Sequence, residues 1–111
     1  MAKCRLKETK FLNLYGRGKE FEERYKRRKR SGDCTEMHEK MLVSYHKNME
    51  LVKLAIDAVE HKPYKQLLYM RFVLLMNTTE IAEELNDSPE NVARKMYRAI
   101  HAVTVPEGVI D

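Results

Sequence analysis

Several features of membrane and secreted proteins are missing from this 111-residue sequence. No apolar run is long enough to span a bilayer, and the basic residues 1–7 are not followed by the apolar stretch of a secretory signal. The two cysteines, Cys4 and Cys34, are too few and too scattered for a disulfide framework, so they suit a reducing compartment. We therefore expect a cytoplasmic protein with no membrane partner.

Motifs of catalytic and metal sites are missing as well. Cys34 and His38 lie one helical turn apart, but no second pair at ligand spacing accompanies them, which argues against a zinc site. The adjacent carboxylates Glu83 and Glu84 face different ways on a helix, a poor geometry for two-carboxylate catalysis. No serine or cysteine lies in a nucleophile motif, and no phosphate-binding loop is present. We expect a protein that is not an enzyme and that holds no metal or cofactor.

The stretch that begins at Asn77 predicts a short capped helix and a sharp turn. Asn77 is a good N-cap, and the Glu80 side chain can reach back to its backbone N–H, which is the capping-box pattern. A helix is therefore expected over residues 77–85. Asn86 and Asp87 form the turn, because asparagine tolerates the left-handed conformation that a sharp helix exit needs.

A second helix is expected to begin at Ser88, which suits the N-cap, with Pro89 in the first helical position, where no N–H is needed. Its apolar face comprises Val92, Met96, Ala99, Ile100 and Val103. Its polar face comprises Glu90, Asn91, Arg94, Lys95 and Arg98. Side chains of the polar kind read DNA grooves and bind phosphates. This is the layout of a helix-turn-helix, whose second helix can enter the major groove, although a plain helical hairpin has the same spacing.

The same segment resembles region 4 of bacterial sigma-70-type factors, a DNA-binding module. The resemblance rests on Arg71-Phe72, the run Glu80-Ile81-Ala82-Glu83-Glu84-Leu85, Ser88, Val92 and Arg98-Ala99-Ile100. It implies a support helix over residues 64–75 in front of the helix-turn-helix. Three positions depart from the family pattern: Leu75 replaces a glycine, Asp87 an apolar residue and Lys95 an aliphatic residue.

The resemblance also implies which residues contact DNA. Glu90 and Arg94 match base-reading positions near the start of the recognition helix, and Asn91 and Arg98 are their neighbours. A short chain with a long helix before such a module further resembles small phage regulators of late transcription, the ArpU- and RinA-like proteins. The resemblance implies a sequence-specific regulator of transcription, encoded by a phage or prophage, whose partner is double-stranded DNA.

Positive charge lies mainly outside this module. Residues 1–32 carry 12 Lys or Arg against 4 acids, whereas residues 33–111 carry 9 against 13. Residues 64–104 carry five of each sign, which is weak for a free-standing DNA binder. Either the amino-terminal arm adds phosphate contacts, or a partner such as RNA polymerase holds the protein at its site.

The basic arm, residues 1–32, is expected to contain a short helix over residues 21–30. Upstream of it, the apolar cluster of residues 11–15 is expected to dock on the core, with Gly16 and Gly18 as a break. We favour phosphate contact by the basic run over a solvated, partly disordered arm. The candidate phosphate ligands are Ser88, Lys95, Arg27, Arg28, Lys29 and Arg30.

Residues 33–62 predict a long central helix, capped by Asp33 or Thr35 and ended at Lys62-Pro63. Its apolar seam has heptad spacing and comprises Leu42, Tyr45, Met49, Val52, Ile56 and Val59. The seam could form a coiled-coil homodimer that pairs two DNA-reading modules. We favour packing within one chain, because the seam is short and further apolar residues widen it.

The sequence thus predicts an all-α protein in four segments: the arm 1–32, the central helix 33–62, the helix-turn-helix module 63–104 and a tail 105–111. The leading interpretation is a DNA-binding regulator. The alternatives are a small helical adaptor that binds RNA polymerase or another protein, and a phage DNA-packaging subunit.

Overall fold

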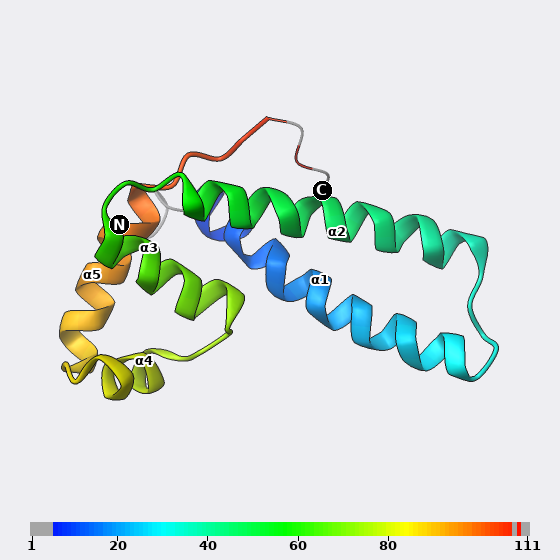
Figure 1. The fold of residues 1–111 in the computed structure, drawn as a ribbon, viewed down its shortest axis with the longest axis horizontal. Coiled ribbons are helices and arrows are strands. Elements are labelled where there is room, and N and C mark those ends of the chain that lie inside the picture. The colour runs from blue at the N-terminus through cyan, green and yellow to red at the C-terminus, as the bar shows by residue number, and fades with distance from the viewer. Residues whose placement is uncertain (1–5, 108, 110–111) are drawn as a thin grey trace.

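The computed structural model describes residues 6–107 and 109, which form an all-α fold (Figure 1). Its elements are α1 (Leu6–Arg30), α2 (Glu36–Asp57), α3 (Lys62–Leu68), the π-helix η2 (Tyr69–Val73), α4 (Thr78–Leu85) and α5 (Pro89–His101). Helices α1 and α2 form a long antiparallel hairpin, and the shorter helices gather at one end of it. The all-α fold class predicted from the sequence is confirmed. Within the described ranges, no helix combines the length and apolar character needed to cross a membrane.

Helix α1 runs without interruption through the two glycines, so the expected break at Gly16 and Gly18 is wrong, as is the short helix over 21–30. A Cβ atom at residue 18 would collide with the Sδ atom of Met49 in α2. The buried side chain of Met49 fills the space beside this glycine, so a larger residue there would have to displace it. Residues 6–30 are therefore not a free arm: they pack along α2.

The first half of α1 belongs to the core. Phe11, Leu12, Leu14 and Tyr15 are all buried, which confirms the predicted docking of this cluster. They join buried side chains from every other element. Among the largest fully buried side chains are Leu12, Val52, Ile56, Leu68, Ile81 and Val92.

Helix α2 begins as expected but ends earlier. Thr35 is its N-cap: its side chain accepts a bond from the backbone N–H of His38, and the His38 ring accepts one from the Thr35 N–H at 3.1 Å. The helix ends at Asp57, so the expected end at Lys62-Pro63 is wrong. Pro63 instead lies in the first turn of α3, where its missing N–H leaves no helical bond unmade.

The apolar seam of α2 packs within the chain, as we favoured. Met49, Val52, Ile56 and Val59 are buried in the core. Towards the other end of the hairpin the ring of Tyr45 stacks on Phe21 of α1, with 4.6 Å between ring centroids. The spacing of the seam therefore reflects the pairing of α1 with α2 in one molecule.

The expected support helix over residues 64–75 is present in altered form. α3 continues into the π-helix η2, and the helical path stops at Leu74. Leu75 then adopts a left-handed conformation, with a φ of 59°. Glycine adopts this conformation without steric cost, whereas leucine does not.

The tail residues that the structure describes pack against the core. Val105 and Val109 of the expected tail are half-buried against it. Residues 108, 110 and 111 of that tail and the whole of residues 1–5, including Cys4, lie outside the described residues. Cys34 is a free thiol.

Candidate nucleic-acid interface

Helix α4 is capped as the sequence predicts. The backbone N–H of Asn77 donates to Glu80 Oε1 at 2.9 Å, and the N–H of Glu80 donates to Asn77 Oδ1 at 2.8 Å. Ile81 and Ala82 are buried in the core and form the inner face of α4. The reciprocal cap is a local interaction, which is why the sequence alone located the start of this helix.

The turn after α4 also has the predicted conformation. Asn86 is left-handed, with φ 55° and ψ 49°. The N–H of Asp87 donates back to the carbonyl oxygen of Ala82 at 2.9 Å. Ser88 is the N-cap of α5, since its Oγ accepts from the N–H of Asn91 at 3.2 Å, and Pro89 opens the helix. The chain thus reverses from α4 into α5 within a few residues.

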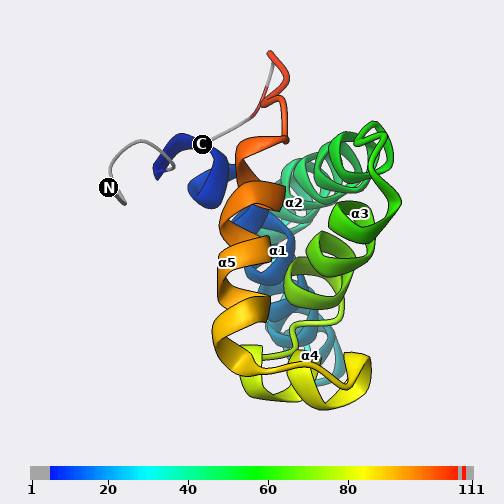
Figure 2. The same cartoon turned by 90° about the vertical axis from the view of Figure 1, so that its left-hand side faces the viewer.

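Helix α5 is divided into a buried and an exposed face. Val92, Met96 and Ala99 are buried, and Ile100 and Val103 also pack in the core. The exposed face comprises Glu90, Asn91, Arg94, Lys95 and Arg98. Figure 2 looks onto this end of the molecule and shows α5 in front of the α1–α2 hairpin. The predicted division of α5 into two faces is confirmed.

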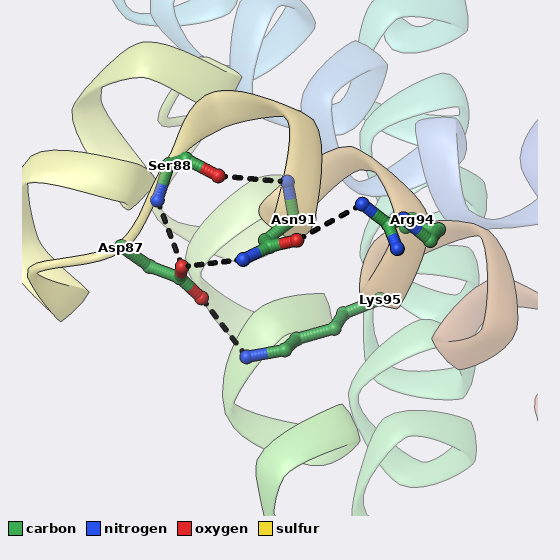
Figure 3. Close-up of polar contacts among 5 residues, drawn as sticks. All are labelled: Asp87, Ser88, Asn91, Arg94 and Lys95. Atoms are coloured by element: carbon green, nitrogen blue, oxygen red, sulfur yellow. Dashed lines mark hydrogen bonds and ion pairs between the residues drawn. The ribbon is translucent and has the colours of Figure 1, made fainter.

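The carboxylate of Asp87 organises the start of the exposed face (Figure 3). Its Oδ1 accepts from the N–H of Ser88 at 2.8 Å and from Nδ2 of Asn91 at 3.1 Å. Its Oδ2 accepts from Nζ of Lys95 at 2.9 Å. One side chain therefore links the turn to the first two turns of α5.

The network continues from Asn91 to Arg94, whose Nη2 donates to Asn91 Oδ1 at 3.0 Å. Both ends of the Asn91 amide are thus engaged, its donor by Asp87 and its acceptor by Arg94. A guanidinium has five N–H donors in a fixed fork, so Arg94 keeps most of its donors for a further partner. The exposed arginine is held at a defined place on the helix.

Hydrogen bonds keep Asp87 charged. The bond from Lys95 and then those from Asn91 and the Ser88 backbone lower the pKa of the Asp87 carboxyl from 3.8 to about 2. The negative charge lies beside the amino terminus of α5, where the helix dipole favours it. It also offsets the charge of Lys95, one of the candidate phosphate ligands.

The other candidate phosphate ligands lie elsewhere. Residues 27–30 form the exposed carboxyl end of α1, at the far end of the long axis from α5 (Figure 1). The molecule extends 47 Å along that axis. The structure therefore places the basic run and the exposed face of α5 apart, and it does not join them in one surface.

Sequence reasoning missed basic residues that lie closer to α5. Lys7, Lys10 and Arg17 line a hollow of about 590 Å³ between α1 and the tail residues Val105 and Val109. The first half of α1 contacts α5, and Figure 2 shows the blue start of α1 beside the orange end of α5. Their helical spacing of three and seven residues was a usable signal. We did not recognise this spacing because a break in the helix was expected at the glycines.

The pair Cys34 and His38 offers no metal centre in the described part of the chain. The Nδ1 atom of His38 caps the start of α2, as described above. No cluster of three or more potential ligand side chains occurs among residues 6–107 and 109.

A comparison of the chain with protein-family models, with curated proteins and with solved structures finds no match.

Proposed function

We propose that α4 and α5 act as a helix-turn-helix that binds double-stranded DNA, and that the protein is a sequence-specific regulator of transcription. The observation that carries the proposal is the exposed face of α5, on which Asp87 holds Asn91 and Asn91 in turn holds Arg94. A recognition helix needs this combination of a buried apolar face and an outward face of ordered polar groups. α5 lies at one end of the molecule, where a duplex can approach it (Figure 2).

The exposed residues take different roles in this proposal. Arg94 and Arg98 lie one turn apart and present guanidinium groups that can pair with the major-groove edge of guanine. Glu90 in the first turn can accept from the amino group of cytosine. Asn91 acts mainly as a positioning residue for Arg94, because both ends of its amide are engaged.

In this proposal the phosphate contacts come from α5 and from the first half of α1. Ser88 lies at the amino end of α5, and Lys95 can exchange Asp87 for a phosphate. Lys7, Lys10 and Arg17 add positive charge on the part of α1 that contacts α5. They supply the net positive charge that residues 64–104, with five charges of each sign, lack.

The resemblance to sigma-70 region 4 and to the small phage regulators supports the same proposal. The capping box at Asn77, the turn at Asn86 and the N-cap at Ser88 are the local features that such a module requires. We accordingly propose that the protein belongs to the control of transcription of a phage or prophage.

Selection of bound duplexes from a random DNA pool tests the proposal. The full-length protein is used at near-physiological salt, and the Arg94→Ala variant is selected in parallel. We expect an enriched motif for the wild type and a relaxed preference at one position for the variant. Bulk binding without enrichment, or no binding, would contradict sequence-specific recognition.

A second function, binding to RNA polymerase or another protein, is favoured by a separate observation. Tyr69, Leu74 and Leu75 are large apolar side chains with 42%, 55% and 52% of their surface exposed. Tyr69 and Leu74 line one hollow with Glu84 of the acidic helix α4. Capture of purified polymerase by the wild type, and its loss in a Tyr69→Ser and Leu74→Ser variant, would support this adaptor role.

A further inference from the structure

The hairpin tip, which we define as residues 24–33, concentrates positive charge at the end of the molecule opposite α5. Its basic residues are Arg24, Lys26, Arg27, Arg28, Lys29 and Arg30. All six are exposed, and they lie within about 9 Å of helix length, at a rise of about 1.5 Å per residue. In the described part of the chain, none of them forms a salt bridge. This charge is therefore available to an external anion.

Three of these side chains line one hollow that is open to solvent. Arg24, Arg27 and Arg28 share a face of α1 and line a hollow of about 310 Å³ together with Ser31 and Asp33. Three guanidinium groups there face one carboxylate, which leaves an excess of positive charge. The planar donor fork of arginine matches the oxygen atoms of a phosphate group. The hollow thus has the chemistry of a phosphate-binding site.

The hairpin tip and α5 lie at opposite ends of the molecule. In Figure 1 the tip lies at the right-hand end of the long axis and α5 at the left-hand end. In Figure 2 the hairpin extends behind α5, away from the viewer. A straight duplex that crosses the end of the molecule at α5 would not reach the tip of the same chain, because the molecule extends 47 Å along the axis between them.

We propose that the hairpin tip binds the phosphates of a second segment of duplex DNA, so that one chain bridges two duplexes. The bridging part rests on the proposed function of α5, whereas the phosphate site at the tip stands on its own geometry. The tip supplies no sequence readout, because its contacts go to the DNA backbone. It therefore holds any nearby duplex, including a distant stretch of the molecule that carries the specific site.

The aromatic side chains at this end favour a duplex over a single strand. Proteins that bind single strands stack the bases on exposed aromatic rings. Here Phe21 is buried and stacks on the half-buried Tyr45. Tyr25 is half-buried, and the Nζ atom of Lys29 lies 5.8 Å from the centre of its ring. The tip thus offers guanidinium and ammonium groups and no open stacking surface.

The test uses the full chain and two duplexes. The first carries the motif enriched in the selection and is fixed to beads, and the second has an unrelated sequence and a fluorescent label. We expect the wild type to retain the labelled duplex on the beads. The tip variant, Arg24→Gln with Arg27→Gln and Arg28→Gln, should lose this capture and keep its binding to the first duplex.

A control variant removes the same charge from exposed lysines that belong neither to the tip nor to α5: Lys47→Gln, Lys53→Gln and Lys62→Gln. It should capture the second duplex as the wild type does. Light scattering checks that both variants keep the wild-type size, since a dimer presents two copies of α5. Capture that survives in the tip variant would come from such paired copies and would overturn the proposal.

A second measurement separates failure of this inference from failure of the proposed function. Binding to an unrelated duplex in solution is followed against salt, and the slope of the logarithmic plot should fall by about 0.9 for each lost phosphate contact in the tip variant. If no motif is enriched but the slope falls, the function of α5 is wrong and the tip site stands. If a motif is enriched and the slope does not change, the tip site alone is wrong.

Two further ligands are included in the same titration. Single-stranded RNA and vesicles that contain phosphatidylserine also carry phosphate groups. Tighter tip-dependent binding to either of them than to the duplex would overturn the assignment to duplex DNA. Weaker binding to both supports it.

Discussion

The Nζ atom of Lys95 lies 2.9 Å from Oδ2 of Asp87, so the ammonium group of α5 is paired with the carboxylate of the turn before it. The other carboxylate oxygen of Asp87 accepts from the N–H of Ser88 and from Nδ2 of Asn91. Asp87 thus connects the turn to the first two turns of α5.

This pair predicts an acid-sensitive contribution to folding. The pKa of Asp87 in the folded protein, about 2, lies below its ordinary value of 3.8. A lowered pKa stabilises the fold above the ordinary value, and the stabilisation is lost as the pH falls from 3.8 towards 2. We expect the free energy of unfolding of the wild type to fall more steeply over this range than that of Asp87→Asn.

Urea unfolding, followed by circular dichroism at several pH values, measures the difference between the two proteins. The pKa of Glu22 is also lowered, chiefly by its hydrogen bond with His46, and it contributes in the same direction. The wild type and the Asp87→Asn variant share that contribution, so it cancels in the comparison. Parallel curves for the two proteins would show that Asp87 does not stabilise the turn.

The same pair predicts an effect on DNA binding. In Asp87→Ala the ammonium group of Lys95 loses its partner and becomes available to a phosphate, so binding to any duplex should tighten. The salt slope should steepen by at most about 0.9, the value for one phosphate contact, because Lys95 of the wild type can already exchange Asp87 for a phosphate. Fluorescence anisotropy with an unrelated duplex measures both quantities. The double variant Asp87→Ala with Lys95→Ala should lose the gain, and a gain that persists in it would exclude Lys95 as its source.

The surroundings of two neighbouring glycines in α1 predict different effects of alanine on stability. Alanine at either place should gain about 1 kcal/mol of helix propensity. At Gly18 the new methyl group meets buried Met49, whereas at Gly16 it would lie 3.3 Å from Cδ2 of the half-exposed Leu75. Overpacking of a core costs about 1–3 kcal/mol, so Gly18→Ala should be less stable than Gly16→Ala by about that amount. Thermal unfolding of both variants measures this difference, and equal stability would mean that the flexible side chain of Met49 moves aside without cost.

The end of the support helix predicts that glycine is better than alanine at one residue and worse at the next. Leu75 has a φ of 59°, which costs a non-glycine residue about 1–2 kcal/mol. Leu75→Gly and Leu75→Ala lose nearly the same contacts of this half-exposed side chain, but only glycine relieves the strain. Leu75→Gly should therefore be more stable than Leu75→Ala by about 0.5–1 kcal/mol. Leu74 has a φ of −83°, so Leu74→Gly should be less stable than Leu74→Ala by about 0.5–1 kcal/mol, through the greater freedom of the unfolded chain. A glycine variant that is less stable than the alanine variant at both residues would show that no strain is relieved at Leu75.

The sequence predicted α4 and α5 almost residue by residue because their boundaries depend on local chemistry. The capping box of Asn77 with Glu80, the left-handed Asn86 and the N-cap Ser88 each act within four residues. The apolar spacing of α5 likewise depends on a single helical period. Local patterns of this kind can be read before the fold is known.

The errors arose where the outcome depended on distant residues. Gly16 and Gly18 suggest a break when read alone, but α1 is unbroken, and the side chain of Met49 from another helix occupies the space beside Gly18. Pro63 was expected to end a helix and instead begins one, because α2 had already ended at Asp57. The separation of the basic run 27–30 from α5 likewise depends on how the long hairpin packs, which no local pattern encodes.

The most direct measurement of the central claim compares two duplexes, one with the enriched motif and one with the same bases permuted, in titrations with the wild type and Arg94→Ala. If α5 reads bases, the variant should lose about 1–3 kcal/mol of binding free energy on the motif and much less on the permuted duplex. Arg17→Ala, which removes a proposed phosphate contact, should lose the same amount on both. Equal losses on both duplexes for Arg94→Ala would contradict base recognition by α5.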